Sequence, residues 1–415
     1  MKPRLFALIF VCFAALRADT LTLDMAVHEA LEKNLALMAE RHNITIADAR
    51  IIQAALKPNP VLTYGQDYQN VFGTGVTAEN NGGPPEWNTR VDIPIERGGK
   101  LERRVELAKA QKSVTELQLL NTIRGLLFDV QNAFVDAQAA RDSLALAREN
   151  LKSLRDVVTI NEARVKAGDL AEVELQRTRI AAMQFENGVK QAELKLRTSV
   201  TKLLLLMGRP ANADGIDITG DLRSERPVFV AEQVKEEAYQ KRPDLLALSR
   251  DRVRSQSDIR LQIAEGKVDY SVGVLYHHQY GYSSSSSMGF FFQTQLPVWN
   301  RNQGEIERAK REEVQVQARV KALEAQIENE VRVSYDQFLT SRELVDRIEK
   351  QLLGNAKEVR DITEYSYRRG EASFVEFLDA QRAYNDAVQS YNDARADYAR
   401  SLYSLETVAG RGVNP

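Results

Sequence analysis

The sequence predicts a mainly α-helical protein that also contributes strands to a membrane β-barrel, built from two copies of one unit. Three observations support this fold class. Apolar residues recur at heptad spacing along very long stretches, four short segments alternate apolar with polar residues, and both features appear in the same order in each half. Charged residues make up 27% of the 415-residue chain, which is typical of a folded protein. A net charge of -2 gives no reason to expect a nucleic-acid partner, whose phosphates would require a basic surface.

Residues 1–18 are predicted to be a signal peptide that is removed from the mature protein. Lys2 and Arg4 give a positive start, residues 5–16 form an apolar run, and Ala18 is small enough for cleavage after it. The single cysteine, Cys12, lies in this segment, so the mature chain would hold neither disulfides nor thiolate metal sites. The alternative is a membrane anchor or a buried N-terminal helix.

The first repeat, expected over residues 19–220, begins with an amphipathic helix over 22–56. Prolines at positions 58 and 60 end this helix, because proline cannot continue an α-helix. Two alternating segments follow and lead into a long helix over 99–163, whose apolar positions keep the seven-residue period of a coiled coil. Gly168 then suits a left-handed helix cap, and a returning helix is expected over 171–206.

The second repeat, expected over residues 221–415, has the same elements in the same order. A helix over 230–264 precedes two alternating segments, a long helix, a glycine turn at Gly370 and a returning helix over 373–408. Matching helices alone would be weak evidence, but matching turns in the same order indicate duplication. Each repeat therefore ends in a long antiparallel helical hairpin with a glycine at its tip.

The alternating segments at 62–68, 87–95, 270–280 and 290–296 predict four strands, each with one apolar and aromatic face. After residue 20 no stretch approaches the roughly 18 consecutive apolar residues of a spanning helix. The chain is therefore expected either to be soluble outside the cytoplasm or to cross a membrane as strands. The polar connections at 69–85 and 281–287 would then lie at the outer surface. The alternative is two hairpins packed on a soluble core.

A sheet that crosses a membrane has to close, because an open edge leaves backbone groups unpaired in lipid. Single-chain barrels start at about eight strands, and this chain offers four, so several copies would have to complete the cylinder. Two copies would leave an interior filled by side chains, whereas three or four would leave an open lumen. The long hairpins would continue the strands as a helical cylinder.

No pattern in the sequence indicates an enzyme or a bound cofactor. The chain has no HExxH, no phosphate-binding glycine loop and no GxSxG. His277 and His278 are adjacent in a predicted strand and point to opposite faces, so they cannot bind one ion together. His28 has Asp24 and Glu32 one helical turn away, which is more typical of a solvated polar face than of a metal site. We therefore expect no dedicated metal site.

Five sequence motifs carry a family resemblance that covers nearly the whole mature chain. They are KPNP (57–60), PIERGGK (94–100), RVKAGDLAEVEL (164–175), LPVWNRNQGEIERA (296–309) and YRRGEASFVEFLDAQR (367–382), of which the last is the most specific. With these motifs the chain resembles the TolC-like outer-membrane efflux family, in particular the outer-membrane component of heavy-metal tripartite pumps of the CzcC and CusC type.

This resemblance implies a homotrimer in the outer membrane, with a twelve-stranded β-barrel on an α-helical barrel that crosses the periplasm. It also implies two partners, a periplasmic adaptor (membrane fusion protein) and an inner-membrane RND transporter. The implied function is a passive exit duct, expected to carry heavy-metal cations. Two alternatives stay open: a soluble periplasmic coiled-coil adaptor or tether, and the same duct exporting proteins or organic toxicants.

The resemblance also implies roles for residues near the hairpin tips. Glu376 and Asp379 match the acidic rings that form a periplasmic gate and select cations. Residues matched to closure of the tips are Glu174, Tyr367, Arg368 and Arg369. The tips expected to contact the adaptor contain Gly168, Leu170 and Gly370. Both arginines precede Gly370, whereas the family can carry a basic residue just after this glycine.

Overall fold

A computed structural model describes residues 19–68, 85–212, 215–280 and 284–412. The predicted signal peptide, residues 69–84 of the first connection and residues 281–283 of the second lie outside the described residues. The chain divides into two compact units. The first comprises Met1–Ala39, Leu120–Arg242 and Gln326–Pro415, and the second comprises Glu40–Leu119 and Pro243–Ala325.

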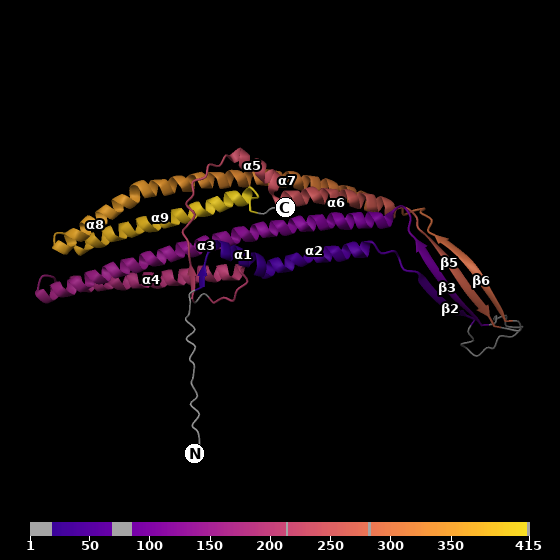
Figure 1. Cartoon of the computed structure of the whole chain (residues 1–415), viewed down its shortest axis with the longest axis horizontal. Coiled ribbons are helices and arrows are strands. Elements are labelled where there is room, and N and C mark those ends of the chain that lie inside the picture. The colour runs from indigo at the N-terminus through magenta and orange to yellow at the C-terminus, as the bar shows by residue number, and fades with distance from the viewer. Residues whose placement is uncertain (1–18, 69–84, 213–214, 281–283, 413–415) are drawn as a thin grey trace, which may run out of the picture. The chain divides into compact units, whose positions relative to one another are not determined.

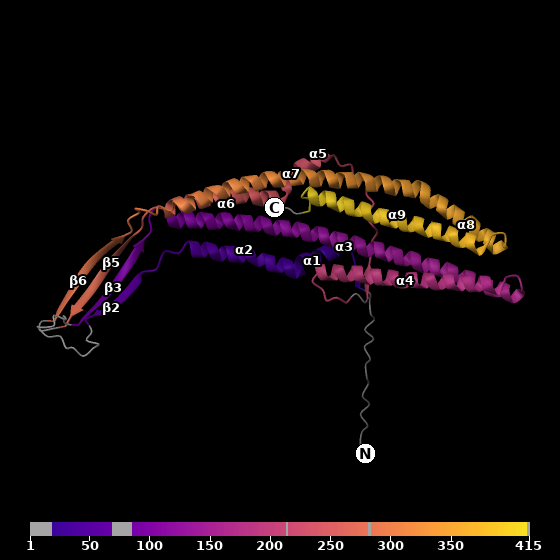
Figure 2. The ribbon, with the colours of Figure 1, turned by 180° about the vertical axis from the view of Figure 1, so that it is seen from behind.

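The second unit contains a four-stranded antiparallel sheet with the order β2-β3-β5-β6 (Figure 2). The strands are β2 (Val61–Asp67), β3 (Glu86–Ile95), β5 (Tyr270–Gln279) and β6 (Ser285–Thr294), so each repeat supplies two neighbouring strands. The repeats meet where β3 pairs with β5 along ten residues, from Glu86 opposite Gln279 to Ile95 opposite Tyr270. All four predicted strands are confirmed, although the fourth spans Ser285–Thr294 where 290–296 was expected.

The two faces of this sheet differ in chemistry, as the alternation predicted. Val91 and Val272 lie on the apolar face and are exposed, as are Phe290 and Phe292 of β6. On the other face Arg90 pairs with Asp92 at 2.8 Å. No described residues of the same unit cover the apolar face. A sheet of a soluble protein normally buries its apolar face in the core, so this exposed face indicates contact with something outside the unit.

Each expected N-terminal helix of a repeat is in fact two helices. The first consists of α1 (Leu23–Lys33) and α2 (Leu35–Ala54), because the side chain of Asn34 accepts a hydrogen bond from the Leu37 N–H at 2.9 Å and starts a new helix. The second consists of α5 (Ala231–Lys241) and α6 (Pro243–Glu265). There the break at Arg242 follows from Pro243, since a residue before proline is driven out of helical geometry.

The long helical hairpins are confirmed, with one difference between the repeats (Figure 1). The first hairpin consists of α3 (Lys100–Ala167), 68 residues without interruption, and α4 (Glu172–Leu206). In the second, α7 (Gln303–Arg347) and α8 (Leu353–Arg369) are joined by a π-helical turn, η1 (Ile348–Leu352), before α9 (Phe374–Val408) returns. Such a turn accommodates one extra residue, which heptad counting does not reveal.

The core of the first unit lies along the predicted heptad seams. Val130 and Phe134 of α3 are buried, as are Ile327 and Phe338 of α7. A cluster that includes Val135, Ala396 and Tyr403 packs α3 against α9. Polar contacts reinforce this pairing of the two hairpins: the amide of Gln381 donates to Asn150 Oδ1 at 3.2 Å, and Arg400 pairs with Asp136 at 2.6 Å. The seam therefore holds both repeats together within one chain.

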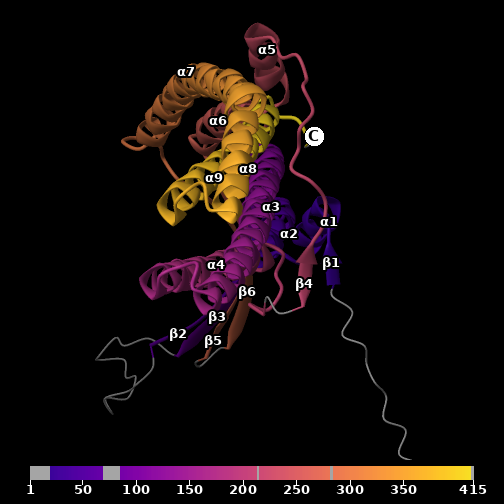
Figure 3. The ribbon, with the colours of Figure 1, turned by 90° about the vertical axis from the view of Figure 1, so that its left-hand side faces the viewer.

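A short parallel pair of strands, β1 (Asp19–Leu21) with β4 (Ile216–Ile218), was not predicted (Figure 3). It joins the start of the described chain to the segment after α4, and the Thr219 N–H donates to the Leu21 carbonyl at 3.0 Å. Three residues are too few to show a period of two, so alternation cannot reveal such a pair.

Candidate functional site

The two hairpin tips have the same backbone geometry. Gly168 and Gly370 both have left-handed φ angles, 82° and 84°. In the first tip the Asp169 N–H donates to the Arg164 carbonyl at 2.8 Å, and in the second the Glu371 N–H donates to the Ser366 carbonyl at 2.9 Å. This pattern is the Schellman motif, which a residue with a side chain would strain at the glycine position. Leu170 is half-buried in the first turn, whereas Gly168 and Asp169 before it are exposed.

The helices that leave the tips begin differently. Ser373 is the N-cap of α9 and forms a capping box with Glu376: the Glu376 N–H donates to Ser373 Oγ at 3.2 Å, and the Ser373 N–H donates to Glu376 Oε2 at 2.7 Å. Ala171 holds the matching position at the start of α4 and offers no side-chain cap. Its backbone angles, φ -71° and ψ 142°, are close to those of Ser373, φ -80° and ψ 158°.

Replacing Ala171 with serine should therefore stabilise the first hairpin. A serine N-cap contributes about 1 kcal/mol relative to alanine, and Glu174 already stands three residues later, as a capping box requires. We expect Ala171→Ser to raise the midpoint of thermal unfolding of the helices, followed by circular dichroism. Ser373→Ala should lower it by a similar free energy. A stabilising effect would be contradicted if Ala171→Ser left the midpoint unchanged while Ser373→Ala lowered it.

Tyr367 lies in a buried hydrogen-bond network that joins the two hairpins of one chain. Its hydroxyl donates to Asn161 Oδ1 at 2.8 Å, and the Asn161 amide donates to Thr178 Oγ1 at 2.9 Å. Asn161 and Thr178 are both 0% exposed, and burial raises the pKa of the Tyr367 phenol. Sequence reasoning singled out Tyr367 but not its two partners, although Asn161 is a polar residue on an otherwise apolar seam.

The other residues matched to tip closure have partners within their own hairpin. Glu174 pairs with Arg177 at 2.8 Å, and Arg368 pairs with Glu364 at 2.6 Å. The Arg369 guanidinium lies over the ring of Tyr365, 4.5 Å from its centroid. Within the described part of the chain none of these three forms an ion pair with the opposite hairpin, and their closing role stays a prediction.

Glu376 and Asp379 are both exposed and lie three residues apart at the start of α9, so they share one face of the helix. The backbone N–H and the hydroxyl of Ser373 lower the pKa of Glu376, which keeps this carboxylate ionised at neutral pH. Glu376 therefore has a local role as a cap besides any role as a gate. The spacing of serine and glutamate, Ser-x-x-Glu, was available in the sequence as a signal for this cap.

Histidines and acids do not gather into a site in the described ranges. No group of three or more metal-ligating side chains occurs there. His28 and Glu32 approach to 3.4 Å but are both exposed, as expected for a solvated helix face. His277 Nε2 lies 3.1 Å from Glu86 on the polar face of the sheet, whereas His278 contacts Ser286 and the ring of Trp87.

Among the helices of the described chain, none has the length together with the apolar character that a membrane crossing requires.

Comparison with known proteins assigns the family. The sequence profile described as outer membrane efflux protein matches the chain twice, over residues 26–209 and 234–411, which together make up most of it. The chain belongs to the outer membrane efflux protein family. Membership makes it a non-enzymatic efflux channel of the outer membrane with a periplasmic helical part, and the double match confirms the duplication. Family membership also excludes the alternative of a soluble periplasmic adaptor or tether.

Curated relatives with different names have similar sequence identities to this chain. CzcC, the cobalt-zinc-cadmium resistance protein of Cupriavidus metallidurans, is 22% identical over 95% of this chain and 91% of its own length. Nodulation protein T of Rhizobium leguminosarum bv. trifolii is 22% identical over 94% and 85%. The pyoverdine export outer membrane protein OpmQ of Pseudomonas putida is 23% identical over 94% and 86%.

Solved structures share the fold. A membrane protein from Pseudomonas aeruginosa superposes with a TM-score of 0.78 at 19% identity, covering 94% of this chain and 92% of that one. The outer-membrane channel OprN gives 0.77 at 17% identity, with 95% and 91% covered. CusC gives 0.74 at 17% identity, with 94% and 92% covered. The TolC-like fold is thereby confirmed.

Proposed function

We propose that three copies of this chain form a passive exit duct of a tripartite pump. Each copy would add its four strands to a twelve-stranded barrel and its hairpins to a helical cylinder. The observation that carries this proposal is the sheet itself. Its apolar face is exposed, and its outer strands, β2 and β6, each pair with only one described strand. When identical copies close the sheet in lipid, the strand edges become paired and the apolar face contacts the hydrocarbon.

The expected partners follow from the tips. We propose that the turns at Gly168, Leu170 and Gly370 contact a periplasmic adaptor, because they are the exposed ends of the hairpins and carry the family motif. An RND transporter in the inner membrane would supply the work. The boundaries proposed for the repeats, 19–220 and 221–415 after a signal peptide of 1–18, place one tip in each.

The proposed cargo is heavy-metal cations. Exposed carboxylates on α9 support it, since Glu376 and Asp379 from three copies would place six acids around one constriction. So does the relative named for cobalt, zinc and cadmium resistance. The relative named for pyoverdine export favours an organic cargo in the same duct, which measurements of metal tolerance separate from metal ions.

Two measurements test the proposal. Native mass spectrometry of the protein extracted in an uncharged detergent should give the mass of three chains. A monomer that stays in solution without detergent would contradict the duct. Deleting the gene should lower tolerance to zinc, cobalt or cadmium salts, and a plasmid copy should restore it. Unchanged metal tolerance together with retention of an organic compound would leave the duct in place and overturn the metal cargo.

A further inference from the structure

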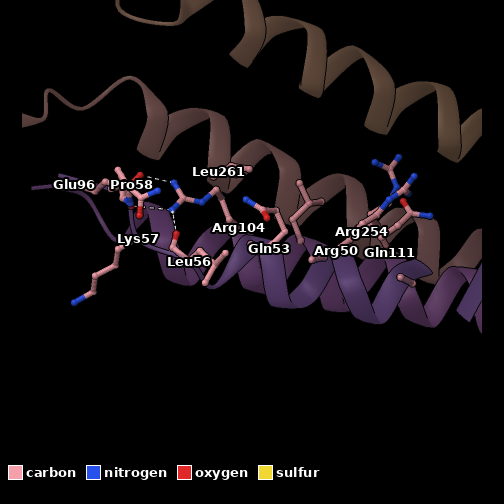
Figure 4. A pocket seen from close by; sticks show the side chains of 15 residues that line it. Arg50, Gln53, Leu56, Lys57, Pro58, Glu96, Arg104, Gln111, Arg254 and Leu261 are labelled. Carbon is pink, nitrogen blue, oxygen red and sulfur yellow. Dashed lines mark hydrogen bonds and ion pairs between the residues drawn. The ribbon is translucent and has the colours of Figure 1, made fainter. Parts of the chain in front are cut away.

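A pocket in the second unit lies beside the sheet, and the proposed transport function does not use it. Its volume is about 760 Å³, within the range of sites for small organic ligands. It is lined by α2, α3 and α6 and by the residues that connect α2 to β2 (Figure 4). One end therefore reaches the ends of the strands, and the other extends along the helices away from them.

Between its two ends the pocket is lined mainly by apolar side chains, together with the amide of Gln53 (Figure 4). Ala47 and Leu261 are buried, and Leu107 and Ala108 of α3 are half-buried, as is Ala54 of α2. These small and aliphatic side chains leave room for a hydrocarbon or an aromatic body. Transfer of such a body from water is favourable in proportion to the apolar area that it buries.

The end far from the strands is cationic. Figure 4 shows Arg50 of α2, Arg254 of α6 and the amide of Gln111 of α3 together at this end of the pocket. Arg254 donates to Asp251 at 2.5 Å, whereas Arg50 is exposed and forms no ion pair or hydrogen bond within the described part of the chain. Arg254 is thus paired with a carboxylate and Arg50 is not, which leaves the positive charge of Arg50 uncompensated.

The other charges of the lining do not compensate Arg50. At the strand end Arg104 is neutralised by Glu96, through bonds from both of its terminal nitrogens, one of 2.8 Å. Lys57 borders the pocket, but in Figure 4 its side chain points away from the rest. Arginine side chains that converge beside an amide donor match the geometry of a carboxylate or phosphate.

We propose that this pocket binds an amphipathic organic anion, with its carboxylate or phosphate at Arg50, Arg254 and Gln111 and its apolar body along Leu107 and Leu261. The apolar body would then extend toward the ends of the strands. An acidic lipid and an amphipathic anion from solution share this chemistry. The site is complete in one chain, so it stands whether or not the duct carries metal ions.

The test uses the full mature protein in nanodiscs of uncharged lipid and the probe decyl phosphate below its critical micelle concentration. Isothermal titration, with empty nanodiscs subtracted, should show one site per chain. Decanol, which lacks the charge, and inorganic phosphate, which lacks the body, should each bind at least about tenfold more weakly. Equal binding of decanol and decyl phosphate would overturn the proposal.

Matched variants assign the site. Arg50→Gln should weaken decyl phosphate binding by about tenfold, because it removes the uncompensated charge. Lys57→Gln removes the same charge from the rim, where it points away, and should leave the affinity unchanged. Ala108→Phe should also weaken binding by filling the apolar middle. Wild-type affinity in both Arg50→Gln and Ala108→Phe would contradict the site.

Mass spectrometry of compounds that copurify with the protein separates the two sources. An acidic lipid at one per chain, depleted in Arg50→Gln, would support the site and identify the lipid. Decyl phosphate binding without any such lipid would support the site and identify a soluble anion. Absence of saturable decyl phosphate binding would overturn it.

Discussion

Neutralising Glu376 and Asp379 together, as Glu376→Gln with Asp379→Asn, should remove most of the cation preference of the assembled duct. Three copies would bring six exposed carboxylates to one constriction, and a passage lined by one sign of charge concentrates counter-ions by about tenfold or more at low salt. We expect the cation-to-anion permeability ratio, taken from the reversal potential in planar bilayers under a salt gradient, to fall toward about 1.

The choice of glutamine at position 376 matters. Glutamine can complete the capping box with Ser373, whereas Glu376→Ala would also remove the cap of α9 and confuse loss of charge with loss of structure. Glu371→Gln is the matched control, since Glu371 is an exposed acid in the same tip but outside α9. An unchanged reversal potential in the double variant would show that these acids do not line the conducting path.

The lowered pKa of Glu376 sets how the cap responds to pH. The ionised carboxylate accepts hydrogen bonds from Ser373, so its contribution to stability is fully present above the ordinary carboxyl pKa of 4.5. This contribution is lost as the pH falls through the lowered value in the folded protein. At neutral pH the residue is charged and the cap is intact, which is the state that the bilayer measurement would sample.

Truncating Phe377 to alanine should destabilise the packing between the hairpin tips by about 3–5 kcal/mol. Phe377 is 0% exposed, and its ring stacks on that of Tyr367 with centroids 5.4 Å apart. It belongs to a cluster that also contains Leu154 and Val157 of α3, so the change would leave a cavity between the two hairpins. Unfolding of the helices, followed by circular dichroism at increasing denaturant, measures the loss.

Val375→Ala is the control for this substitution. Val375 is two residues away on the same helix, but it is exposed, so its truncation should change the free energy of unfolding by less than about 0.5 kcal/mol. Similar losses in the two variants would contradict a buried cluster between the tips. A large loss in Phe377→Ala alone would confirm that the tips of one chain are held together by their apolar core.

Local periodicity explains which parts of this protein could be predicted. The heptad seam through Val130 and Phe134 and the alternation through Val91 and Ile93 are repeated many times over, so single exceptions do not hide them. The glycines of both tips were equally visible, because a left-handed helix cap favours one residue type. Because the unit is duplicated, each of its elements could be predicted from two separate segments of the sequence.

Features that depend on one residue or on distant partners were missed. Asn34 breaks a helix by capping the next one, and the π turn at 348–352 shifts the phase of a helix without any break in its composition. Among the candidate site residues, Tyr367 has the buried partners Asn161 and Thr178, which lie about 200 residues earlier in the sequence. No local pattern reports such a contact.

The repeated helical hairpins, the four strands and the polarity of their faces could be predicted from the residue pattern alone, because they follow from periods of 3.5 and 2 residues along the chain. In contrast, the burial of Tyr367 against Asn161 and the shared pocket of Arg50 and Arg254 became visible only in the folded chain. These arrangements arise where separate elements meet, and the free energy of a contact between elements depends on geometry that neither element encodes alone.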